Sequence, residues 1–218
     1  MRLKPGDEEG RVWRMNLLSV TDRFVFIAID ARVVVFEQAH AAQTDAFARI
    51  QTLPIPDHRN AAEAVRTDDV PSPINHLIVS PEATTLVVAT DAGQVVLWRI
   101  APTVEDIGTP HWPCEVLTSL DAIQHESTWG LALHDRCLAF SSDMPIIDMV
   151  WLETDGTVAR RVAFEAHASN IPCLAFSAQG KYLLSTSIDR HLKIWSIVSC
   201  NGTASPECIY DTGDNHQW

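Results

Sequence analysis

The chain has 218 residues, 46% of them hydrophobic and 20% charged, a composition typical of a globular protein with a buried core. Its formal net charge is −12 and its 16 lysines and arginines are scattered, so we expect no direct binding of DNA or RNA. Residues 1–10 are charged, and no apolar run approaches the roughly 20 residues of a spanning helix, which predicts neither a usual secretory signal nor a membrane segment.

The five cysteines are odd in number and show no Cys-x-x-Cys spacing. This pattern predicts neither a disulfide framework nor a zinc site. We therefore expect an intracellular protein, in the nucleus or the cytoplasm, with no metal and no cofactor.

Short runs rich in β-branched and aromatic residues recur along the chain in four sets, separated by turn residues, and predict strands. In chain order, the first set comprises residues 15–20, 24–29 and 32–36, with an outer strand at 49–53. The second comprises 74–80, 84–90 and 95–98, with an outer strand at 115–120. The third comprises 129–133, 136–141 and 148–151, and the fourth 171–177, 181–188 and 192–195.

The third run of each set ends on an aromatic residue, in turn Phe36, Trp98, Trp151 and Trp195. The last two lie 44 residues apart, close to the repeat of about 40–45 residues found in one class of propeller. The longer earlier spacings indicate insertions, which we place at residues 39–73 and 101–128. In the third set, Asp143 and Asp148 interrupt the pattern.

The fourth set resembles a repeat of the WD-type β-propellers, since it combines His167, Ser187, the turn residue Asp189 and Trp195. The resemblance implies that these four side chains form a hydrogen-bonded structural tetrad. Serine, histidine and aspartate can also signal a hydrolase, but the sequence lacks a Gly-x-Ser-x-Gly elbow. We therefore expect the tetrad to be structural and predict no catalytic residue.

The expected fold is all-β, a single WD40-type propeller domain over residues 1–218. Four blades are recognisable, at about 11–54, 70–120, 127–164 and 167–211. Because such propellers usually close with about seven blades, we expect a partial or open propeller. It would be part of a larger propeller, a truncated gene product, or an arc that self-association or another chain completes.

Two segments resemble a narrower family, the fungal WD-containing regulators of ribonucleotide reductase gene transcription. They are residues 127–134, Ser-Thr-Trp-Gly-Leu-Ala-Leu-His, with 138–142 after them, and residues 167–172, His-Ala-Ser-Asn-Ile-Pro. This resemblance implies a non-enzymatic scaffold that regulates ribonucleotide reductase gene expression or the DNA-damage response, or a substrate receptor of a cullin ubiquitin ligase.

The function that we expect is therefore that of a protein-interaction scaffold, with other proteins as its partners. The alternative is a hydrolase or lyase with a site on the propeller face. Such a site would be built from histidines in or beside the two insertions, namely His40, His58, His76 or His111.

Overall fold

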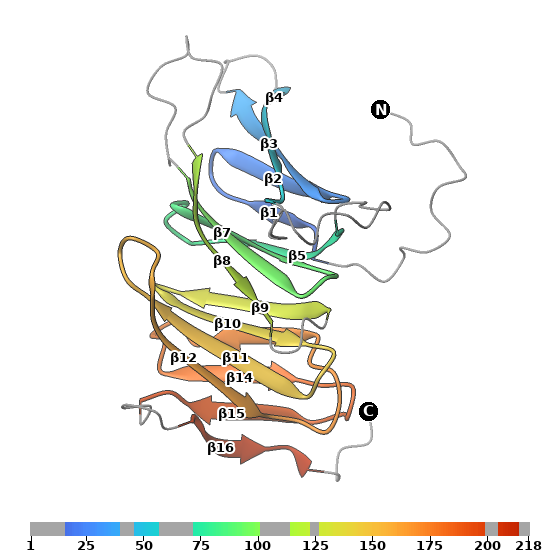
Figure 1. Cartoon of the computed structure of the whole chain (residues 1–218), viewed down its shortest axis with the longest axis vertical. Helices are drawn as coiled ribbons and strands as arrows, with labels where there is room; N and C mark the ends of the chain where they lie inside the picture. Colours follow the sequence, from blue (N-terminus) through green and yellow to red (C-terminus); the bar gives the residue numbers. More distant parts are fainter. Residues whose placement is uncertain are drawn as a thin grey trace, which may run out of the picture.

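The structure is a computed structural model that describes residues 16–39, 46–56, 72–100, 114–122, 127–198 and 205–213. The strands in these ranges form four antiparallel sheets of four strands each. In every sheet the strands lie side by side in chain order, so each sheet is a simple meander (Figure 1). The prediction of an all-β fold with four blades of the propeller type is confirmed.

Each sheet contains four strands that are consecutive in the sequence. The first sheet contains β1 (Leu18–Val20), β2 (Phe24–Ile29), β3 (Arg32–Ala39) and β4 (Ala46–Pro54). The second contains β5 (Ile74–Val79), β6 (Thr85–Thr90), β7 (Gln94–Ile100) and β8 (Cys114–Asp121). The third contains β9 (Thr128–His134), β10 (Cys137–Ser142), β11 (Ile146–Leu152) and β12 (Val158–Glu165). The fourth contains β13 (Cys173–Phe176), β14 (Tyr182–Thr186), β15 (Leu192–Ser196) and β16 (Glu207–Asp211).

The two segments interpreted as insertions each contribute the outer strand of a sheet. β4 and β8 include the outer strands expected at 49–53 and 115–120, and each is longer than expected. Residues 40–45, 57–71, 101–113 and 123–126 of these segments lie outside the described part of the chain.

The four sheets stack face to face in chain order, with the first and fourth at opposite ends of the stack (Figure 1). The first strands of successive sheets are neighbours, because β5 contacts both β1 and β9, and β9 contacts β13. The described residues therefore form an arc of blades that does not close into a ring.

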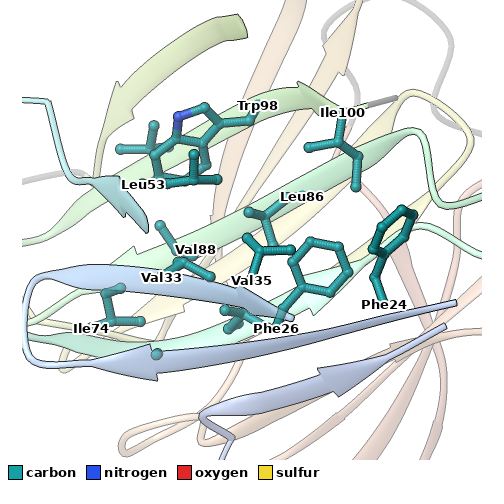
Figure 2. Close-up of a cluster of buried hydrophobic side chains, with 13 residues drawn as sticks. Phe24, Phe26, Val33, Val35, Leu53, Ile74, Leu86, Val88, Trp98 and Ile100 are labelled. Atoms are coloured by element: carbon teal, nitrogen blue, oxygen red, sulfur yellow. The ribbon is translucent and has the colours of Figure 1, made fainter. Parts of the chain in front are cut away.

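Apolar cores lie between successive sheets, because the side chains of each strand alternate between the two faces. In β2, Phe24 and Phe26 are buried while Val25 and Ile27 point to the opposite face. The two phenylalanines pack with Val35 of β3 against Leu86 of the second sheet (Figure 2). A second and a third core fill the two following junctions, so apolar burial joins all four sheets.

Candidate functional site

The fourth sheet contains a buried cluster of four hydrogen-bonded side chains. His167 precedes β13, Ser185 lies on β14, Asp189 lies in the turn after β14, and Trp195 lies on β15. The His167 Nδ1 lies 3.0 Å from the Asp189 Oδ2, and its Nε2 lies 2.7 Å from the Ser185 Oγ. The indole N–H of Trp195 donates to the same Ser185 oxygen at 2.9 Å. We call these four residues the polar tetrad.

The prediction that Ser187 supplies the hydroxyl group of this cluster is wrong, because the structure places Ser185 there. Ser185 points from β14 to the same face as Leu183, toward the third sheet, and is 1% exposed. Ser187 lies after the end of β14, where its hydroxyl donates to the Ser169 carbonyl at 3.0 Å and accepts from the Asp189 N–H at 3.1 Å. It therefore shapes the turn that holds Asp189.

Burial and hydrogen bonding set the charges within the polar tetrad. Burial lowers the pKa of His167 from its usual value, although its hydrogen bond to Asp189 opposes this shift. Burial alone would raise the pKa of Asp189, but hydrogen bonds from the backbone N–H groups of Ala168 and His191 and from His167 outweigh it and lower the pKa to about 2. A neutral imidazole therefore donates its Nδ1–H to an ionised carboxylate.

The polar tetrad resembles a hydrolase triad in composition and differs from it in access. With Nδ1 protonated, His167 accepts the Ser185 hydroxyl hydrogen at Nε2, as a general base would. The same oxygen is buried and also accepts the hydrogen bond from Trp195. A nucleophile must reach a substrate carbon, whereas this oxygen is buried on the face of the fourth sheet that packs against the third sheet.

Two further aspartates, which the sequence analysis did not single out for this role, connect neighbouring sheets. Asp91, in the turn after β6, accepts from the Ser127 hydroxyl of the third sheet at 2.8 Å. Asp143, in the turn after β10, accepts from the side-chain N–H of Asn170, which precedes the fourth sheet, at 3.0 Å. We call these two contacts the turn bridges. Both aspartates directly follow the second strand of their sheet, a shared position that would have identified them.

The third sheet also contains an ion pair between a buried carboxylate and a partly exposed arginine, which reaches the second sheet. Arg161 of β12 donates to both carboxylate oxygens of Asp148 on β11, at 2.8 Å each. Its Nη2 also donates to the Asp121 carbonyl of β8 at 2.7 Å. Asp148 therefore interrupts the apolar pattern because it anchors an inter-sheet contact.

Of the four histidines of the alternative enzyme site, the structure describes His76. His76 lies buried on β5, and its Nδ1 donates to the Trp129 carbonyl at 2.7 Å. Burial lowers the pKa of His76, and the hydrogen bond to Trp129 partly offsets this. His40, His58 and His111 lie outside the described residues.

The described ranges contain no group of three or more histidine, cysteine or acidic side chains arranged to hold a metal ion. Within the same ranges, no helix is long and apolar enough to cross a membrane.

Comparison with known families identifies one repeat. The sequence model described as WD domain, G-beta repeat, matches residues 159–196. The chain carries a WD40 repeat. This WD40 repeat takes in most of β12 and all of β13, β14 and β15, so it links the outer strand of the third sheet to the first three strands of the fourth. All four residues of the polar tetrad lie within it.

Two relatives also carry WD repeats by name. An uncharacterized WD repeat-containing protein of Schizosaccharomyces pombe is 26% identical over 211 residues, which cover 86% of this chain and 40% of that protein. A WD40 repeat-containing protein of Dictyostelium discoideum is 34% identical over 73 residues, which cover 33% of this chain and 11% of that protein. The chain thus spans less than half the length of each relative.

Two solved structures share the fold. A chain in the crystal structure of the mitotic checkpoint complex matches with a TM-score of 0.60 and 17% identity, over 92% of this chain and 51% of that one. A Bacteroides uniformis protein provisionally assigned as a 6-phosphogluconolactonase matches with a TM-score of 0.66 and 14% identity, over 90% and 54%. At these identities the matches show the fold alone.

Proposed function

We propose that this chain is a non-enzymatic protein-interaction scaffold. The observation that carries the proposal is the enclosed polar tetrad, in which His167, Ser185 and Asp189 are all engaged in hydrogen bonds inside one blade. WD40 repeats generally serve to bind proteins, and a formal net charge of −12 repels nucleic acids. Other proteins are therefore the proposed partners.

A fluorophosphonate probe separates this function from that of a serine hydrolase. Such a probe reacts with a nucleophilic, solvent-accessible serine, so the folded chain should remain unlabelled. The control is the Ser185→Ala variant, which removes the serine of the tetrad. Stoichiometric labelling of the wild-type chain that disappears in this variant would contradict the scaffold function.

The positive test is affinity capture followed by quantitative mass spectrometry and reconstitution with purified partners. We expect the wild-type chain to recover at least one protein at near-stoichiometric amounts. The Trp195→Ala variant should lose it, because the fourth blade loses its buried indole. Ile209→Thr, on the exposed strand β16, is the matched control and should retain the partner. Recovery of no stoichiometric partner by the wild-type chain would contradict the proposal.

The narrower proposal is a nuclear or cytoplasmic scaffold that regulates ribonucleotide reductase gene expression or the DNA-damage response, or that serves a ubiquitin ligase as substrate receptor. It is supported by the resemblance of residues 127–134 and 167–172 to the fungal regulators. Deleting the gene in its host and measuring ribonucleotide reductase transcripts, with and without DNA damage, tests it. We expect the induction ratio to change, and an unchanged ratio would contradict this role while leaving the scaffold function intact.

A further inference from the structure

The fourth sheet presents a row of apolar side chains on the face that points away from the third sheet. The row runs across all four strands, because Ala175, Leu184, Ile194 and Tyr210 are paired in register. Tyr210 is 49% exposed and Ala175 is exposed, while Leu184 and Ile194 are half-buried. We call these four residues the fourth-sheet row.

The corresponding rows of the other three sheets are covered by the next sheet. They include Phe26 and Val35 in the first sheet, Val87 and Leu97 in the second, and Ala139 and Met149 in the third. All six side chains are fully buried in the cores between sheets. The fourth-sheet row therefore continues a series of interfaces that the chain uses three times, and no further sheet follows it in the described residues.

The first sheet presents the matching kind of surface at the other end of the stack. Leu18 and Val20 of β1 pair in register with Ile27 and Val25 of β2 and share their face, opposite the second sheet. Leu18 is 59% exposed and Val20 is 62% exposed. In the second, third and fourth sheets, the face that corresponds to this one packs against the apolar row of the preceding sheet.

At the fourth sheet, an apolar residue stands at the position of the aspartate that makes a turn bridge in the second and third sheets. The backbone N–H groups of Asp91 and Asp143 donate to the carbonyls of Pro73 and Ser127, and the N–H of Ile188 donates to the equivalent carbonyl of Asn170. Ile188 thus occupies the bridge position of the fourth sheet, where it is 64% exposed.

Ile188 adds to the apolar surface at this end of the stack. In the third sheet the same turn position holds Asp143, which accepts from a side-chain N–H of the next sheet. An aspartate at position 188 would need such a donor, whereas an isoleucine needs none. The open end of the fourth sheet is therefore apolar at this turn as well as along the fourth-sheet row.

We propose that the open face of the fourth sheet docks onto the open face of the first sheet in a second copy of this chain. This inference names one partner of the proposed scaffold and rests on that function. A two-fold axis makes the two junctions between the copies identical and closes a ring of twice four sheets. Eight blades lie within the range of known propellers, about four to eight.

The first test measures the molar mass of the chain by size-exclusion chromatography with light scattering. The chain has a mass of 24.2 kDa, and we expect a species of twice that mass at micromolar concentration. A mass of one copy at all accessible concentrations would overturn the proposal, as would assemblies that grow beyond two copies. Neither result would affect capture of other proteins, which tests the scaffold function separately.

The second test uses two charged variants, Ile188→Asp and Leu18→Lys. Each alone places an unpaired charge at a junction, so we expect self-association to weaken at least about 100-fold. Because both side chains are more than half exposed, the thermal melt of each variant should stay close to that of the wild type. Val158→Lys, on an exposed strand position outside both faces, is the matched control and should still dimerise.

Mixing the two charged variants decides how the copies are arranged. In a ring of one copy of each, both substitutions, of opposite charge, lie at one junction and the other junction keeps two wild-type faces, so the mixture should recover the mass of two copies. A dimer through two fourth sheets would instead be broken by Ile188→Asp, unaffected by Leu18→Lys and not restored by mixing. That outcome would overturn the proposed arrangement.

Discussion

At the residue scale, the polar tetrad joins three separate stretches of the WD40 repeat. His167, from the segment before β13, and Trp195, from β15, both bond the Ser185 hydroxyl, and Asp189, from the turn after β14, bonds the far side of the His167 ring. The Trp195 ring also packs edge-on against Phe164 of the third sheet, with ring centroids 5.0 Å apart. Because these buried polar groups are one another's hydrogen-bond partners, the loss of one leaves its neighbours without a partner.

Replacing Ser185 should therefore destabilise the chain more than replacing Ser187. Ser185→Ala leaves the His167 Nε2 and the Trp195 indole N–H without their partner, and we expect a loss of about 1–3 kcal/mol in the free energy of unfolding. Ser187→Ala removes hydrogen bonds at a half-buried turn and should have the smaller effect. Chemical denaturation of both variants measures the difference, and a larger effect of Ser187→Ala would refute the assignment of the tetrad.

The lowered pKa of Asp189 predicts a stabilising contribution that acid removes. A carboxyl group that titrates at about 2 in the folded chain and at its ordinary value when unfolded stabilises the fold fully above about pH 4. The contribution disappears as the pH falls toward 2. Asp189→Asn should cost about 2 kcal/mol at pH 7 and flatten the stability curve between pH 4 and 2. An equal loss of stability between pH 4 and 2 in the wild type and in the Asp189→Asn variant would count against this assignment.

The buried histidines predict a second pH dependence, nearer neutrality. Burial lowers the pKa of both His167 and His76 in the folded chain, so the unfolded chain binds protons first as the pH falls through about 6.5. Stability should be complete above that pH and decline below it. Melting temperatures between pH 7.5 and 5 measure the decline, which should be shallower in His76→Gln. A melting temperature that rises on acidification would contradict the neutral, buried state of these rings.

At the element scale, the sheets are joined by apolar cores together with the turn bridges. Asp143 shows how tightly a bridge is integrated, because its carboxylate accepts from the Trp129 indole N–H within its own sheet and from Asn170 of the next. One turn residue therefore fixes both the first strand of the third sheet and the approach to the fourth.

Removing this bridge should loosen the junction between the third and fourth sheets. Asp143→Ala removes the carboxylate that accepts from Trp129 and Asn170, and we expect faster amide hydrogen exchange in residues 167–191 than in the wild type. Asp155→Ala is the matched control, since Asp155 is an exposed turn residue of the same sheet whose carboxylate accepts from Thr157. Equal exchange in the two variants would show that the bridge does not hold this junction.

The strands that the sequence revealed are those whose apolar alternation marks a buried face, such as β2 and β14. The outer strands β12 and β16 gave no such signal, because every side chain of β16 is exposed and β12 carries Arg161, whose buried partner is Asp148.

For the polar tetrad, the sequence could not separate Ser185 from Ser187. Both side chains point to the same face of a continuous strand, and the choice depends on where β14 ends. The turn bridges join residues 36 and 27 positions apart, beyond any local pattern.

At the scale of the whole molecule, the arc has two different ends. The fourth sheet ends in an apolar row with Ile188 beside it, and the first sheet ends in Leu18 and Val20. Exposed apolar patches of this kind mark interaction surfaces, so the same stacking that builds the arc also prepares it to bind further sheets. The scaffold function and the proposed pairing of two copies both depend on this open architecture.

Small-angle X-ray scattering of the chain, coupled to size-exclusion chromatography, tests the open arc most directly. We expect the mass of two copies at micromolar concentration and, on dilution, an elongated single copy whose radius of gyration exceeds that of a closed globule. A compact chain of this length has a radius of gyration of about 17 Å. A single copy with that radius at every concentration would contradict the arc and its open faces.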